Sequence, residues 1–309
     1  VGGTWRENTY PGLTYITVGN GAIEFPTMAN AGVPSAIGAG NGFLATTAST
    51  LFRFTGSEAA STDRSFAIGS SPVGFEQAGS APVTLTGTVT NQSAGTRSFR
   101  LINDTAQAAV FAGLLSNGPG ILNLIKEGAG VWTLNTPNTY TGFTQIVGGT
   151  LEIAAGGTIG SGPLLLTGGA TLSLNPSAAA GFSLTLPAVT VTGSGRIAIP
   201  AASSGTSTLT LAGLAVNNGF LTVDAPDAGT SANRILIAGG LAAGPVAWIR
   251  LNGGGAQYDA TDGLKPYAVA PSVHIAARGG VIPAAPGETV AIDTPGTTGP
   301  VTLSAPLTE

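Results

Sequence analysis

The hydrophobic residues of this chain fall in short runs that turn residues separate. Between Leu124 and Asn175, glycine pairs such as Gly148-Gly149 and Gly156-Gly157 divide the runs. From Thr150 to Ile153 apolar and polar residues alternate, which places Leu151 and Ile153 on one face of a strand. We find no run with a helical period of ordinary length. Short strands between glycine turns are typical of a β-solenoid, an all-β fold in which strands coil and stack.

The same stretch contains turn residues in a fixed order: Lys-x-Gly-x-Gly, an apolar strand, Asn-x-Tyr-x-Gly, a Thr-rich strand and Gly-x-Leu. The residues that fit are Lys126, Gly128, Gly130, Asn138, Tyr140, Gly142, Thr144, Gly149 and Leu151. In order and spacing this stretch resembles the passenger-associated repeat of bacterial autotransporters, the autotransporter-associated β-strand repeat. The resemblance covers about fifty residues well and the rest loosely. It implies a right-handed parallel β-helix, an outer-membrane β-barrel translocator as partner, and display at the cell surface.

A degenerate copy of the stretch opens the chain. Asn8, Tyr10 and Gly12 align with Asn138, Tyr140 and Gly142, and Phe43-Leu44 falls on Leu165-Leu166. Asparagine satisfies backbone groups at turns, and glycine supplies positive φ. Tyrosine can lay its ring along an apolar face with its hydroxyl in water. We interpret these residues as a structural turn motif; a sugar-stacking platform of Tyr10 and Tyr140 is the alternative.

The pattern predicts a single elongated rod in three parts. Residues 1–117 are expected to form solenoid with the degenerate copy and loop insertions, 118–175 the repeat, and 176–309 further coils. At roughly 20–27 residues per coil, the chain would make about 11–15 coils and a rod of roughly 50–70 Å. Both ends look cut from a longer polypeptide, and no polar cap of the kind that usually ends a solenoid is evident.

Composition narrows the possible partners. Charged residues make up only 8% of the chain, and its net charge is −4. Its 11 lysines and arginines are scattered, so we expect no nucleic acid binding, which needs clustered cations. No apolar run reaches the roughly 18 residues of a membrane helix, so we expect no membrane insertion. The chain has 0 cysteines, which excludes disulfides and thiolate metal sites.

Catalytic chemistry has few candidate residues. The one histidine, His274, alternates with apolar neighbours, as on the outer face of a strand. Ser194, between two glycines, is predicted in a hairpin turn and not in a nucleophile elbow. Asp259 and Asp262, followed by Lys265, lack the further oxygen ligands of a calcium loop and are predicted to form a turn. We therefore expect no catalytic residue, metal or cofactor.

Three functions fit these observations. The first is a structural extracellular protein, a subunit or segment of a surface fibre or surface layer, because unpaired strand edges at a solenoid's ends allow end-to-end self-association. The second is the adhesive passenger stalk of an autotransporter, which would bind glycans or cell surfaces. The third is a polysaccharide-active enzyme, since such enzymes also use β-helices.

Overall fold

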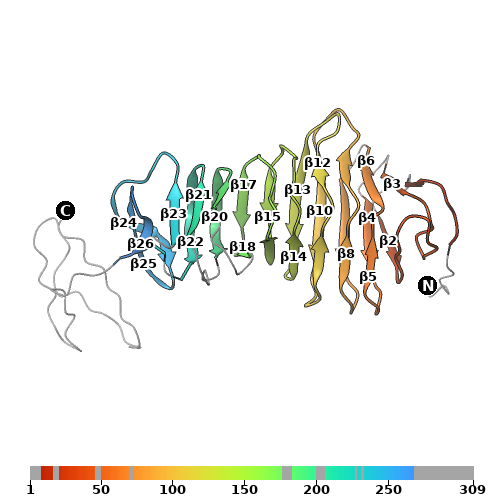
Figure 1. Cartoon of the computed structure of the whole chain (residues 1–309), viewed down its shortest axis with the longest axis horizontal. Coiled ribbons are helices and arrows are strands. Elements are labelled where there is room, and N and C mark those ends of the chain that lie inside the picture. Colours follow the sequence, from red (N-terminus) through yellow and green to blue (C-terminus); the bar gives the residue numbers. More distant parts are fainter. Residues whose placement is uncertain are drawn as a thin grey trace, which may run out of the picture.

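The strands stack side by side into a rod (Figure 1). The computed structural model describes residues 8–16, 21–45, 50–69, 72–175, 183–199, 206–226, 228–230 and 233–267. Within these ranges the chain forms strands β1 to β26 and no helix. No described segment is therefore a helix long and apolar enough to cross a membrane.

Most strands belong to three faces, and one circuit through the three faces is called a coil. The first face contains β2 (Gly21–Phe25), β4 (Thr50–Phe54), β7 (Val73–Gln77), β10 (Arg97–Asn103), β13 (Leu122–Glu127), β15 (Thr144–Ile146) and β17 (Leu164–Thr167). The second face contains β5 (Ala60–Thr62), β8 (Val83–Leu85), β11 (Ala109–Phe111), β14 (Val131–Leu134), β16 (Thr150–Ala154) and β18 (Ala170–Asn175). The third face contains β1 (Thr14–Ile16), β3 (Gly42–Ala45), β6 (Ser65–Ile68), β9 (Val89–Asn91) and β12 (Leu115–Ser116), and later β19 (Ser183–Leu186), β21 (Ser207–Leu211) and β23 (Asn233–Ile237).

Parallel pairing from coil to coil builds the predicted β-solenoid. One column of paired residues on the first face contains Ile23, Phe52, Phe75, Leu101, Lys126, Ile146, Leu166, Val191 and Val216. The described chain thus makes about 9 coils, fewer than the sequence predicts. Nine layers correspond to roughly 40 Å. The estimate was too high because it counted residues 268–309, which lie outside the described ranges, and strands that do not coil.

The coils shorten in the middle of the rod. Leu101 and Lys126 are paired neighbours 25 residues apart, whereas Lys126, Ile146 and Leu166 follow at intervals of 20 residues. Part of the loss is on the third face, where no strand is assigned between β14 and β15 or between β16 and β17. The rest is at the corner between the first and second faces, which has five residues between β10 and β11 but three between β13 and β14. Asn138, Tyr140 and Gly142 of the turn motif lie where the first of these strands is missing.

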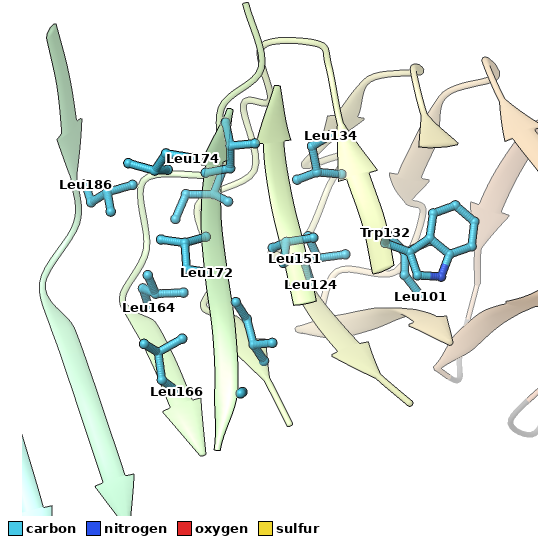
Figure 2. Close-up of a cluster of buried hydrophobic side chains, with 14 of the residues drawn as sticks. Leu101, Leu124, Trp132, Leu134, Leu151, Leu164, Leu166, Leu172, Leu174 and Leu186 are labelled. Atoms are coloured by element: carbon cyan, nitrogen blue, oxygen red, sulfur yellow. The ribbon is translucent and has the colours of Figure 1, made fainter. Parts of the chain in front are cut away.

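The core runs along the inside of the rod. Its first half is aromatic, and the rings of Phe43, Phe52 and Phe66 lie with centroids 4.7 to 5.2 Å apart. Leucines fill the middle, as Figure 2 shows around Leu151, Leu164 and Leu172. Full burial of one such side chain contributes roughly 1.5–3 kcal/mol to stability. Burial of inward side chains from every coil therefore stabilises the rod.

The first and second faces merge toward the C-terminal end. β20 (Val189–Ala198) and β22 (Leu214–Asp224) each run through both faces, with a register shift between Thr192 and Ser194. Ser194 therefore lies within a strand, and the predicted hairpin turn at this position is wrong. A glycine at φ 76°, Gly193, provides the bend without ending the strand.

The last described strands turn antiparallel, where the sequence predicts further coils. β24 (Gly244–Leu251) pairs in parallel with β22 over three residues and antiparallel with β25 (Gly254–Asp259). β26 (Gly263–Pro266) is antiparallel to β25 and meets β23 at the pair Ile235–Gly263. These strands lie at the blue end of the rod in Figure 1.

The N-terminal copy of the repeat has equivalent contacts on a different face. The Ala39 N–H donates to the Tyr10 carbonyl at 2.9 Å, as the Ser161 N–H donates to Tyr140 at 3.0 Å. Thr14 pairs with Phe43 on the third face, whereas Thr144 pairs with Leu164 on the first. Phe43 thus corresponds to Leu164, one residue from the predicted alignment.

Candidate functional site

The turn motif begins at a corner between the first and second faces. Lys126 occupies an inward position in register with Leu101 and Ile146, and it is fully buried. Its ammonium donates to the carbonyls of Glu127 at 2.7 Å, Gly128 at 2.8 Å and Gly148 at 3.2 Å. These contacts use all three donors of a lysine. Because Gly148 belongs to the following coil, Lys126 ties two coils together.

The glycines of Lys-x-Gly-x-Gly let neighbouring coils approach closely. Gly128 has φ 79°, and a Cβ there would clash with the backbone of Asn103. A Cβ on Gly130 would clash with Thr105 and with the Asn103 side chain. Gly149, at φ 60°, leaves no room for a Cβ against Gly128 and Gly130. An asparagine therefore cannot stand in place of Gly128 and donate hydrogen bonds to the carbonyls of this corner. Lys126, two residues upstream of Gly128, donates those hydrogen bonds instead.

Earlier corners of the rod use amide side chains for the same purpose. Asn103 Nδ2 donates to the carbonyls of Gln107 at 3.0 Å and Val131 at 2.9 Å. Gln77, in register with Asn103, donates to Gly79 and Ala81. Sequence reasoning missed these two residues. The available signal was an amide residue just before a turn. The sequence alone does not show whether such a side chain is buried.

The environment of Lys126 shifts its titration. Burial lowers the pKa of Lys126 to about 8, although the charges of Asp104 and Glu127 act in the opposite direction. The ordinary lysine value is 10.5. Asp104 also accepts the Ala129 N–H at 3.0 Å, which fixes its carboxylate beside this corner. Protonated Lys126 therefore satisfies the corner carbonyls at the cost of burying a charge.

We expect this shift to appear in the pH dependence of stability. Between pH 8 and 10.5 the unfolded chain binds more protons than the folded chain at Lys126, so the free energy of unfolding rises with pH. The rise from this group should approach about 3 kcal/mol. Urea unfolding at pH 7, 8, 9 and 10 measures it, with Lys126→Met as the reference. Equal slopes for the two proteins would contradict the prediction.

Asn138 takes the place of the missing third-face strand. Its Oδ1 accepts the Leu115 N–H at 2.8 Å from the preceding coil. Its Nδ2 donates to the Thr158 carbonyl at 2.7 Å in the following coil, and to Thr136 at 3.1 Å. The Asn138 N–H donates to Thr158 Oγ1 at 2.9 Å. One residue thus connects three successive coils, and Thr158 is a partner that the sequence motif did not indicate.

Tyr140 points into the rod and is fully buried. Its hydroxyl hydrogen-bonds Thr144 Oγ1 at 2.6 Å. Burial raises the pKa of Tyr140 to about 12, against the opposing effect of hydrogen bonds from the Gly160 backbone and Thr144. The prediction that its hydroxyl reaches water is wrong, and so is a sugar-stacking role for this ring. With the third-face strand absent, the ring fills the volume that inward strand residues fill elsewhere.

Two further glycines, Gly142 and Gly160, allow neighbouring coils to approach closely around Tyr140. A Cβ on Gly160 would press against the Tyr140 ring, and a Cβ on Gly142 would clash with Leu122 and Asn123. Asn123 Oδ1 accepts the Phe143 N–H at 3.1 Å just beyond Gly142. Gly142 was expected from the motif, whereas Gly160 was not.

The N-terminal copy places its tyrosine differently. Tyr10 is 58% exposed and folds over Gly12, where a Cβ would lie 2.9 Å from the ring. Asn8 Oδ1 accepts the Tyr10 N–H at 3.0 Å and closes a local turn. Both Asn8 and Tyr10 line a cavity of about 200 Å³ beside Phe43 and Phe52. The two copies share a turn but not a buried ring.

The catalytic candidates do not assemble into a site in the described residues. Asp259 Oδ1 accepts the N–H groups of Thr261 at 2.8 Å and Asp262 at 3.1 Å, so the predicted turn is present. These backbone bonds to Asp262 and Thr261 lower the pKa of Asp259, which disfavours a general acid there. Lys265 lies 3.4 Å from Asp259 and 3.6 Å from Asp262. The described residues contain no cluster of three or more potential metal ligands, and His274 lies outside them.

Comparison with known proteins identifies the motif. Residues 124–153 match the passenger-associated-transport-repeat family model. The chain is 31% identical over 232 residues to the adhesin BmaC autotransporter of Brucella suis biovar 1 (strain 1330). The match covers 70% of this chain and 6% of that protein. No solved structure matches. Residues 124–153 therefore form a passenger-associated transport repeat within a β-solenoid, and the similarity to an autotransporter implies secretion across the outer membrane to the bacterial cell surface.

Proposed function

We propose that this chain is part of an adhesive passenger stalk that binds glycans on other cell surfaces. The observation that carries the proposal is the similarity to an adhesin over 70% of the chain. A rod of about 9 coils presents outward side chains in regular columns, which suits contact with an extended ligand. The scattered carboxylates in the described chain favour binding over catalysis.

The surface best suited to a sugar lies on the second face, over β20, β22 and β24. Phe220 is 40% exposed, and the Arg250 guanidinium lies 5.1 Å from its ring centroid. Pairing places Arg196, Thr222 and Arg250 in one column on successive strands. Arg196 also pairs with Asp224, and its side chain stays 53% exposed. Arg196 and Arg250, two cations on either side of Thr222 in a chain of net charge −4, favour an acidic polysaccharide as ligand.

Adhesion of a non-adherent bacterium that displays the chain tests this proposal. We expect binding to cultured cells and to acidic glycans on an array, and loss of most of it in the double variant Phe220→Ala, Arg250→Ala. The matched control is Val147→Ala, since Val147 is also exposed (43%) but no arginine contact is found beside it in the described structure. Display levels measured with an antibody correct for expression. No binding by the displayed parent chain would contradict the adhesive function.

End-to-end assembly into a fibre or surface layer stays a prediction. Electron microscopy of native material tests it, because fibres with an axial repeat near the length of one rod would require stacking. A polysaccharide-active enzyme is the remaining alternative. Turnover of acidic glycans that is lost in Asp259→Asn, Asp262→Asn would support it and contradict a purely adhesive role.

A further inference from the structure

Two arginines on the second face are separated by a strand that carries no charge at the same position. Arg196 of β20, Thr222 of β22 and Arg250 of β24 are paired neighbours. Two strand spacings therefore separate the Cα atoms of the two arginines by about 9–10 Å. Each of the three residues lies between two buried residues of its own strand, so its side chain points outward. This arginine patch presents a cation, a neutral residue and a cation on successive strands.

Side chains of the middle strand hold the two guanidinium groups apart. The Arg250 guanidinium lies over the Phe220 ring, 5.1 Å from its centroid, and Arg196 Nε donates to the Asp224 carboxylate. Phe220 and Asp224 precede and follow Thr222 by two residues on β22. The two guanidinium groups thus extend toward opposite ends of β22 and do not converge. Because both contacts form without a ligand, the cations lose less freedom when a ligand binds.

The charges of the patch favour anions at its two arginines and disfavour an anion between them. The Arg196 side chain is 53% exposed, and Nε is one of the five N–H donors of a guanidinium, so a solvent-borne carboxylate can reach the group. A planar guanidinium binds a carboxylate through two parallel hydrogen bonds. The Asp224 carboxylate, whose side chain is 32% exposed, would repel an anion placed over Thr222. The favoured ligand therefore has two anionic groups with a neutral unit between them.

We propose that the arginine patch selects a polysaccharide in which acidic and neutral sugars alternate. This inference rests on the glycan-binding function proposed above and specifies the charge pattern of the ligand. Two strand spacings are close to the length of two pyranose units in an extended chain. Carboxylates on every second sugar would therefore reach Arg196 and Arg250, with the neutral sugar over Thr222. A polymer with an acid on every sugar would place a further carboxylate over Thr222, where no positive charge neutralises it.

Binding of two polymers to the full chain tests the inference. Hyaluronan has a carboxylate on every second sugar, whereas polygalacturonate has one on every sugar. Oligomers with equal numbers of carboxylates are compared by isothermal titration calorimetry at one ionic strength, because salt screens exposed charges. We expect the parent chain to bind hyaluronan about 3–5-fold more tightly, since one exposed charge interaction has a modest effect.

A charge-conserving swap separates the charge pattern from the identity of the sugars. Thr222→Arg combined with Arg250→Thr keeps two cations but places them on neighbouring strands, about 5 Å apart. We expect this variant to prefer polygalacturonate. The matched control is Arg234→Thr, which removes an exposed arginine from β23 on the third face and should bind both polymers as the parent does. Urea unfolding of each variant shows that it is folded.

Arg250→Thr alone is the second variant, in case the swap does not fold, and it should lose the preference for hyaluronan. Equal binding of both polymers by the parent, or an unchanged preference in the folded variants, would overturn the alternating pattern while acidic-glycan binding stands. If the displayed chain adheres to cells but the purified chain binds neither polymer, the adhesive function stands and this inference is overturned. Absence of adhesion would instead contradict the proposed function itself.

Discussion

Tyr140→Ala is expected to lower the free energy of unfolding by about 3–5 kcal/mol, the range for truncating a large buried aromatic side chain. The ring is fully buried where the third face has no strand, so nothing in the described structure would fill the space. The substitution also leaves Thr144 Oγ1 without its partner at 2.6 Å. Urea unfolding followed by fluorescence of the buried Trp132 measures the change.

Tyr10→Ala is the matched control for this experiment. Tyr10 occupies the same place in the N-terminal copy of the motif, but it is 58% exposed. Its truncation should change the free energy of unfolding by less than about 0.5 kcal/mol. Equal losses for the two variants would mean that burial of the ring is not what stabilises the repeat.

Lys126→Met is expected to lower the free energy of unfolding at pH 7 by about 2–3 kcal/mol. Methionine matches the apolar residues above and below it in the inward column. It cannot donate to the carbonyls of Glu127, Gly128 and Gly148, and an unsatisfied buried polar group costs about 1–3 kcal/mol. Relief of the buried charge offsets part of this loss.

The only other lysine provides the control. Lys265 forms partly exposed ion pairs with Asp259 and Asp262, and exposed ion pairs contribute little to stability. Lys265→Met should therefore have a smaller effect than Lys126→Met in the same urea titration. A Lys126→Met protein as stable as the parent would show that an apolar side chain serves this corner equally well.

The sequence was sufficient to predict the fold class and the turn positions of the repeat. Strand alternation and glycine spacing are local properties, so they identify a stacked β-fold without knowledge of the partners. The count of coils was less accessible, because the strand and turn pattern does not show which strands stop coiling, as β25 does. The length of each coil was also hidden, since it depends on whether the third face forms a strand. That depends on Asn138 and Tyr140, whose side chains replace a strand only in the packed rod.

The roles of individual residues were harder to predict than their positions. Tyr10 and Tyr140 have the same sequence context, yet one is exposed and the other is buried. The difference arises because the two copies lie on different faces, which is a consequence of the residues between them. The antiparallel pairing of the last described strands was also hidden, since β24 to β26 have the same strand and turn pattern as the coils.

The short coils around Tyr140 have a mechanical consequence. A beam is most compliant in bending where its cross-section is smallest, and two successive intervals of only 20 residues make this part the slenderest of the described rod. A sideways load on the rod should therefore concentrate its curvature here. Asn138 and Lys126, which link adjacent coils at this point, would then limit how far the rod flexes before its layers separate.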